Sequence, residues 1–102
     1  MARFDVYKYA SKTAPLVVDV QADLLSDLHT RVVIPLAPEK KARKEALPRL
    51  KPMVRVHRED YILITTDIGT LTKSSLGKPV ANIEDAHRQD ITDALDFLFQ
   101  GF

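Results

Sequence analysis

The chain contains no cysteine and no tryptophan, and only three of its 102 residues are glycine. Without cysteine it has no disulfide, no thiolate zinc site and no cysteine nucleophile. It also has no glycine-rich phosphate loop and no Gly-x-Ser-x-Gly motif of the kind that marks many hydrolases. Stability must therefore come from packing, and the motifs of common enzyme classes are missing.

Long apolar runs are also absent, since no stretch approaches the roughly 20 residues needed to cross a bilayer. The first nine residues carry three charges where a signal peptide has an apolar core. We therefore expect a cytoplasmic protein with no membrane partner. With 45% hydrophobic and 28% charged residues, the composition is that of an ordinary globular chain, and the length predicts one domain over residues 1–102.

The net charge is only +1, but the charges are unevenly placed. Between Pro38 and Arg58 there are eight Lys or Arg residues against two Glu, whereas Glu84 to Phe102 holds five acidic residues and one Arg. No aromatic residues interleave with the basic run, as they do in single-strand nucleic-acid binders. This pattern favours an acidic protein partner over nucleic acid, although a solvated surface is the ordinary outcome for such a run.

Alternating apolar residues and turn signals predict a sheet of short strands. We expect two hairpins, a short strand ended by Pro35, a short, mostly solvated helix or turn in the basic run and a weaker strand after Gly69. The predicted strands are Arg3–Tyr9 (half-buried, with Phe4 and Val6 on one face), Leu16–Val20, Val32–Ile34, Met53–Val56, Tyr61–Thr66 and Thr70–Leu76.

One long helix is predicted near the C-terminus, introduced by Asn82 and Asp85 at capping-box spacing and ended by Gly101. Its core-facing stripe is Ile91, Ala94, Leu95 and Leu98. Phe97 lies off that stripe, so we expect Phe97, together with Phe99, to form a homodimer interface. The predicted fold class is α+β and mainly β: a small barrel-like antiparallel sheet with one C-terminal helix.

The order of several motifs along the chain resembles the CcdB family of toxins. The matching segments are FDVYKY at the start, LVVDVQADLL, RVVIPL, ITTD, VANI, HRQDI and a helix ending Phe99-Gln100-Gly101-Phe102. The resemblance implies a homodimer of SH3-like barrels, each with a C-terminal helix. It implies the toxin of a type II toxin–antitoxin (plasmid-maintenance) module, which binds the A subunit of DNA gyrase and traps the cleaved-DNA complex. A CcdA-like antitoxin would neutralise it, and DNA would be contacted only through the antitoxin complex.

Carried over by position, the resemblance assigns two sets of contact residues. Gyrase contact falls on Leu24, Leu25, Asp96, Phe99, Gln100, Gly101 and Phe102. Antitoxin contact falls on two basic stretches, namely Lys8 and Lys12 in the first loop and Lys40, Lys41, Arg43, Lys44, Arg49 and Lys51 in the basic run. No catalytic residue, cofactor or metal is implied.

The tail departs from the family pattern. The best-known CcdB toxins end in Trp-Gly-Ile, and their paired tryptophans stack on an arginine of gyrase, whereas this chain has Gln100 and Phe102 at the corresponding positions and Asp96 for a neutral asparagine. A lost aromatic anchor at the centre of an interface typically costs about 2 kcal/mol or more. The first alternative is therefore a non-toxic or retargeted module that binds antitoxin only.

A second alternative comes from another class of protein, the MazF/Kid-like endoribonucleases, which resemble CcdB in fold. Arg31, His57 and Asp67 would nominally supply acid–base groups for RNA cleavage. Those enzymes lack the VDVQxDLL and helix-end pattern present here. The three histidines (His29, His57 and His87) also lack the spacing of a metal site, so none is expected.

Overall fold

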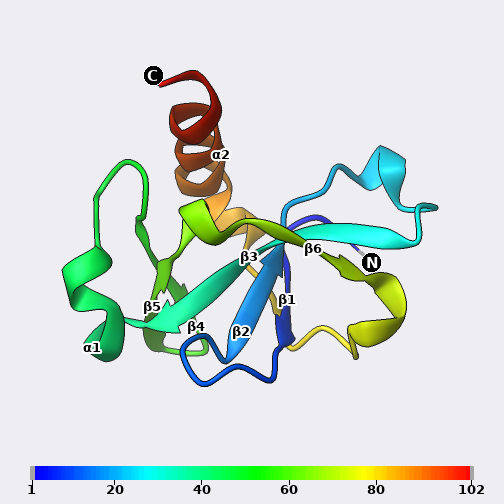
Figure 1. Ribbon diagram of the computed structural model, residues 1–102, viewed down its shortest axis with the longest axis horizontal. Coiled ribbons are helices and arrows are strands. Elements are labelled where there is room, and N and C mark those ends of the chain that lie inside the picture. Colours follow the sequence, from blue (N-terminus) through cyan, green and yellow to red (C-terminus); the bar gives the residue numbers. More distant parts are fainter. Residues whose placement is uncertain (1, 102) are drawn as a thin grey trace.

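The computed structural model describes residues 2–101, and it is built around one curled antiparallel sheet with a helix across it (Figure 1). The strands are β1 (Asp5–Lys8), β2 (Leu16–Asp19), β3 (Thr30–Pro38), β4 (Met53–Val56), β5 (Glu59–Leu63), β6 (Gly69–Thr72) and β7 (Ala81–Asn82). The helices are α1 (Glu39–Ala42), α2 (Glu84–Gln100) and the short 3-10 helices η1 (Asp23–Leu25), η2 (Arg43–Glu45), η3 (Thr65–Asp67) and η4 (Lys73–Ser75).

Strand order across the sheet is β4-β5-β3-β2-β1-β7, and β6 pairs with the first half of β3. The predicted first hairpin is present, with Val6 opposite Val18, and β7 pairs with the free side of β1. The second predicted hairpin is β4–β5, and its two turn residues, His57 and Arg58, both have positive φ angles of 51° and 68°. Such a two-residue turn matches the right-handed twist of the flanking strands.

Strand β3 is longer than predicted, because it does not end at Pro35. Pro35 lies opposite Val17 of β2, and its carbonyl accepts a hydrogen bond from the Ile64 amide at 3.0 Å. On the edge of β3 that faces away from β2, the partner strand changes at Pro35, from β6 before the proline to β5 after it. The missing N–H therefore falls where the ladder is interrupted in any case, and the strand tolerates the proline.

The prediction that the first strand is half-buried was wrong. Phe4 and Val6 belong to the main core with α2, but Tyr7 is also fully buried, packed with Val17 and Val33 on the opposite face of the sheet. That second face is covered by Leu71 of β6 and by Leu76 after η4. The sheet is therefore buried on both faces in this region.

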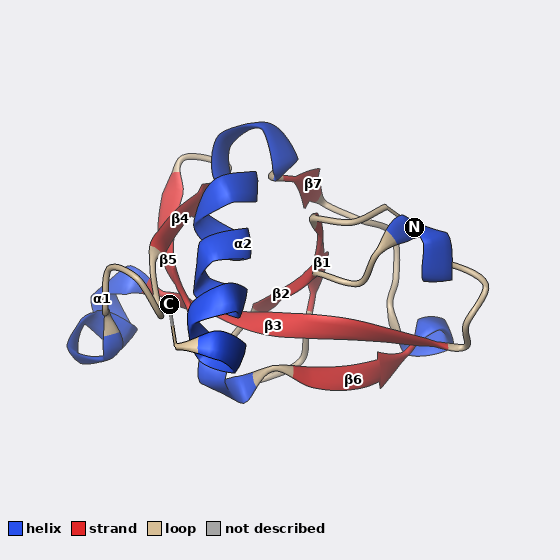
Figure 2. Ribbon diagram, turned by 90° about the horizontal axis from the view of Figure 1, so that it is seen from above, coloured by secondary structure: helices blue, strands red, loops and turns tan. Residues whose placement is uncertain are grey.

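Helix α2 lies across one face of the sheet, between β4 and β5 on one side and β1 and β7 on the other (Figure 2). Of the predicted apolar stripe, Ile91 and Ala94 are fully buried, while Leu95 and Leu98 are only partly buried. The expected capping box does not form: the Asn82 side chain accepts from the Glu84 amide at 3.0 Å, and no side chain caps the helix at Ile83. Gly101 ends the helix in the left-handed conformation, with φ of 79°.

The architecture confirms the predicted fold class, which is α+β and mainly β, with a half-barrel sheet and a C-terminal helix. None of the helices within residues 2–101 is both long and apolar enough to traverse a bilayer.

Candidate functional site

The free end of α2 presents polar and aromatic side chains to solvent. Phe99 is 70% exposed, and Asp96, Gln100 and Gly101 are exposed beside it. The Gly101 amide donates to the Phe97 carbonyl at 2.9 Å, which closes the helix while its left-handed backbone turns the chain away. We call Asp96 and Phe99–Gly101 the helix tip; Phe102, which the family resemblance adds to it, lies outside the described residues.

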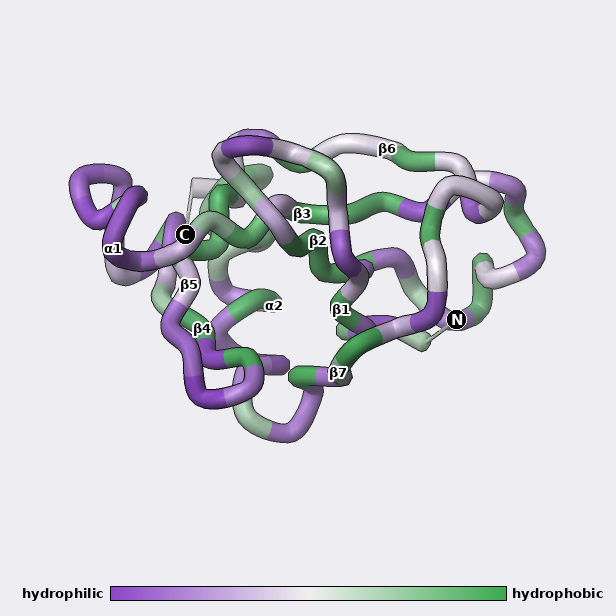
Figure 3. Tube along the Cα trace, turned by 90° about the horizontal axis from the view of Figure 1, so that it is seen from below, coloured by the Kyte–Doolittle hydropathy of each residue, from purple (hydrophilic) through white to green (hydrophobic). Residues whose placement is uncertain are grey.

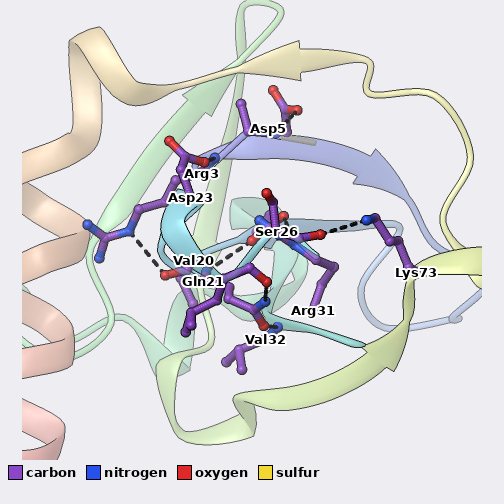
Figure 4. A network of polar contacts seen from close by, with 12 residues as sticks. Arg3, Asp5, Val20, Gln21, Asp23, Ser26, Arg31, Val32 and Lys73 are labelled. Carbon is purple, nitrogen blue, oxygen red and sulfur yellow. Dashed lines mark hydrogen bonds and ion pairs between the residues drawn. The ribbon is translucent and has the colours of Figure 1, made fainter. Parts of the chain in front are cut away.

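The second predicted gyrase element is η1, an exposed 3-10 helix that carries two leucines and is held by the buried side chain of Gln21. Leu24 is 94% exposed and Leu25 46% exposed. Buried Gln21 holds the loop in place, because its side-chain amide donates to the Leu25 carbonyl and accepts from the Val32 amide, both at 3.0 Å (Figure 4). The Asp23 carboxylate accepts from the Arg3 amide at 2.7 Å. These hydrogen bonds fix the backbone around η1, and the exposed side chain of Leu24 is therefore held in a defined position.

Within one protomer, these two elements do not meet. Figure 1 places the cyan helix η1 and the red end of α2 on opposite sides of the molecule. A partner that contacts both must span the protomer, or must meet one element from each of two copies.

The basic run folds as α1 followed by η2, and most of its charge is exposed (Figure 3, where α1 is coloured as hydrophilic). Lys40, Lys41 and Lys44 are exposed and form no ion pair with the described residues. Arg43 pairs with Glu39 at 3.1 Å, and this contact raises the pKa of its guanidinium. Lys51 pairs with Glu45 at 3.3 Å.

The other predicted antitoxin residues, Lys8 and Lys12, are exposed at the same end of the sheet as α1. Lys8 ends β1, and its neighbours across the sheet are Leu16 and then Leu36, two residues before β3 ends. Helix α1 begins directly after β3, at Glu39. The structure therefore brings the two predicted antitoxin stretches to one end of the sheet.

Arg49 is placed differently from the lysines of the basic run. Its guanidinium carbon lies 4.4 Å from the centroid of the Phe97 ring. The two residues, assigned by sequence to an antitoxin surface and a dimer interface, thus contact each other within one chain. Phe97 was predicted to be exposed unless another chain covered it; here its ring is half-buried, with the chain's own Arg49 over it.

Sequence reasoning missed a buried polar cluster on the second face of the sheet. Arg31 and Asp19 are both fully buried, and the guanidinium Nε donates to the carboxylate at 2.7 Å. Nearby Tyr7 donates weakly to Asp5 at 3.4 Å. Burial, reinforced by the charges of Asp5 and Asp19, raises the pKa of Tyr7 to about 12. The signal in the sequence was Asp19 itself, a charge inside an apolar strand, whose partner lies twelve residues away.

The three residues nominated for RNA cleavage do not form an exposed site. Arg31 is fully buried in its pair with Asp19, so it does not reach a polynucleotide at the surface. His57 lies at the β4–β5 turn, with Nε2 2.7 Å from the Val80 carbonyl, and Asp67 lies on η3. No group of three or more metal-ligating side chains occurs within residues 2–101.

Together these features describe a small α+β protein, mainly β, that exposes three candidate contact surfaces: the apolar helix η1, the aromatic helix tip and the basic end. A model of the family described as CcdB protein matches residues 3–101. The chain belongs to the CcdB family, whose members are toxins of toxin–antitoxin modules.

Proposed function

We propose that this protein is a gyrase poison: it binds the A subunit of DNA gyrase through the helix tip and η1, and traps the complex in which DNA is cleaved. The observation that carries this proposal is Phe99, a large aromatic side chain that is 70% exposed at the end of α2. Exposed aromatic residues at a protruding tip are typical anchors of protein interfaces. Membership of the CcdB family supports gyrase as the partner.

The same proposal gives the basic end a role. An acidic, disordered antitoxin tail of the CcdA type binds Lys40, Lys41 and Lys44, with Lys8 and Lys12 beside them, and thereby neutralises the toxin. Lysines without an intramolecular carboxylate partner are available to such a tail, and long-range attraction accelerates its association.

Gln100 favours a second candidate function, a module that binds antitoxin without poisoning gyrase. Its amide cannot stack on a guanidinium as an indole does, although its oxygen can accept one hydrogen bond, worth about 1 kcal/mol. Residual affinity for gyrase therefore rests on Phe99 and on the apolar loop η1.

The deciding measurement is the amount of linear DNA that purified gyrase forms across a titration with the toxin. We expect the wild-type chain to trap cleaved DNA and Gln100→Trp to do so at concentrations about tenfold lower, because two paired tips each gain an aromatic contact. A chain ending at Leu98, which lacks Phe99 and the residues after it, should trap none, and Lys78→Glu, on an exposed loop, serves as the control. If wild type traps nothing and Gln100→Trp does, the second function holds. If the truncated chain traps as well as wild type, the helix tip is not the gyrase site.

A further inference from the structure

The last two turns of α2 are weakly held by the body of the protein. From Leu95 to Gly101 no side chain is fully buried, whereas Ile91 and Ala94 fix the middle of the helix in the core. No basic residue occupies the final turn, so nothing in the helix itself balances the partial negative charge at its C-terminal end. The direction of the helix tip therefore depends on contacts from outside the helix.

One such contact comes from a closed loop. The amide of Leu47 donates to the carbonyl of Lys51 at 3.2 Å, and the amide of Lys51 donates back at 2.7 Å. Pro48 inside this loop and Pro52 after it restrict the backbone further. Arg49 lies at the tip of this closed loop, with its guanidinium over the ring of Phe97.

The surroundings of Arg49 separate it from the antitoxin surface. Arg49 and Pro48 share a shallow depression of about 300 Å³ with Asp90, Asp93 and Asp96 of α2. None of these carboxylates is within ion-pairing distance of Arg49, but together they repel an approaching acidic chain. Lys41 and Lys44, in contrast, line a depression whose other lining residues, Lys40 and Arg43, are also basic.

We propose that Arg49 is a positioning residue of the helix tip: its guanidinium on Phe97 fixes the direction in which Phe99, Gln100 and Gly101 leave the sheet. The ring and the cation attract each other, and the cation also neutralises the C-terminal end of the helix. Arg49 thus contributes to gyrase binding, through the helix tip, and not to antitoxin binding. The importance of that direction for gyrase rests on the proposed function, whereas the contact itself does not.

The primary test is ¹⁵N relaxation on the isolated protein. In Arg49→Ala we expect the amide order parameters of residues 97–101 to fall from about 0.85 to below 0.6. Arg43→Ala, which removes an exposed arginine of the basic run paired with Glu39, should leave them unchanged. Arg49→Lys keeps the charge and should restore order in part. Phe97→Leu should mobilise the tip as Arg49→Ala does, and the double variant should be no worse than either alone.

Two binding experiments test whether Arg49 contributes to gyrase binding and not to antitoxin binding. Arg49→Ala should weaken gyrase trapping about two- to fivefold, the loss expected for an exposed cation–π contact. It should change affinity for a hexaglutamate probe less than Lys41→Ala does. Unchanged order parameters, or a loss of hexaglutamate affinity equal to that of Lys41→Ala, would overturn the inference. If the wild-type protein traps no gyrase, the proposed function is wrong. The ¹⁵N relaxation data would still decide whether Arg49 positions the helix tip.

Discussion

At the scale of single residues, the most consequential feature is the ion pair between Arg31 and Asp19, because both groups are removed from water. Taking two charges into the interior is expensive, and the pair repays that cost only through close contact. The Asp19 carboxylate accepts two hydrogen bonds, from Arg31 Nε at 2.7 Å and from the backbone amide of Gln21 at 3.0 Å. Both terminal nitrogens of Arg31, in contrast, are buried without a hydrogen-bond partner among the described residues. The pair therefore specifies how β2 and β3 align more than it adds stability.

Removing one member of this pair should be severe. Asp19→Asn leaves the Arg31 charge buried without a counter-ion, and we expect a loss of about 3 to 5 kcal/mol in the free energy of unfolding, measured by urea denaturation. Asp67→Asn, at an exposed residue of η3, should change it by less than about 0.5 kcal/mol. Replacing both partners, Asp19→Leu with Arg31→Met, should recover most of the loss. A loss below about 1 kcal/mol for Asp19→Asn would contradict this account.

Tyr7 predicts how stability responds to alkaline pH. Folding raises the pKa of its phenol from the ordinary value of 10.0 to about 12, since burial and the neighbouring carboxylates disfavour the phenolate. The stability that this shift contributes is complete below pH 10 and is lost as pH rises through 12. Two pKa units correspond to roughly 2 to 3 kcal/mol. Denaturant titrations at pH 9 and pH 12 should therefore show a smaller loss for Tyr7→Phe than for wild type. Tyr9→Phe, at a 40% exposed tyrosine, should lose as much as wild type.

At the scale of elements, the sequence predicted those whose signals are local. The two hairpins, the short basic helix and the long C-terminal helix follow from apolar spacing and turn residues, and all four are present. Burial on the second face of the sheet was not predictable in this way, because alternation along β1 does not reveal that Leu71 and Leu76 cover Tyr7. The same holds for Pro35, which is tolerated only because β3 changes partners there.

For the candidate site, sequence reasoning grouped residues by position and charge sign, and the structure separates some of them. Arg49 lies in the basic run along the chain, yet its guanidinium is over Phe97 of α2. Lys51 and Arg43 each form an ion pair with a glutamate of the same run. These distinctions depend on where side chains meet across the fold, which residue counts along the chain cannot supply.

The α1–η2 element supplies a prediction about antitoxin binding. Lys41→Glu with Lys44→Glu should lower the affinity for an acidic peptide such as hexaglutamate roughly tenfold at low salt, because two attractive charges become repulsive. The difference should shrink as salt is added. Titration calorimetry at two ionic strengths measures both effects, with Lys78→Glu as the control outside the element. Equal affinities of variant and wild type at low salt would mean that the element is only a solvated surface.

At the scale of the whole molecule, the two most exposed large apolar side chains within residues 2–101 are Leu24 and Phe99. Both are more than two-thirds exposed, and the elements that carry them, η1 and the end of α2, lie on opposite sides of the protomer (Figure 1). Isolated exposed leucines are common, but Phe99 lies at the end of α2 beyond the buried Ile91 and Ala94, and its ring is too exposed to contribute much to the core of the protomer. A second copy related by a two-fold axis would pair the helix tips and would present two equivalent copies of η1 to one partner.

We therefore predict a homodimer whose helix ends meet at the two-fold axis. Sedimentation equilibrium at micromolar concentration should give twice the 11.5 kDa chain mass. Phe99→Ser removes an apolar ring from each copy, and at about 2 kcal/mol per ring it should weaken dimerisation by at least roughly a hundredfold. Leu28→Ser, which truncates a 50% exposed leucine between η1 and β3, should leave the mass unchanged. A wild-type monomer would remove the paired tips on which trapping of gyrase depends. A Phe99→Ser variant that stays fully dimeric would place the dimer interface on another surface and leave the aromatic tip to the partner alone.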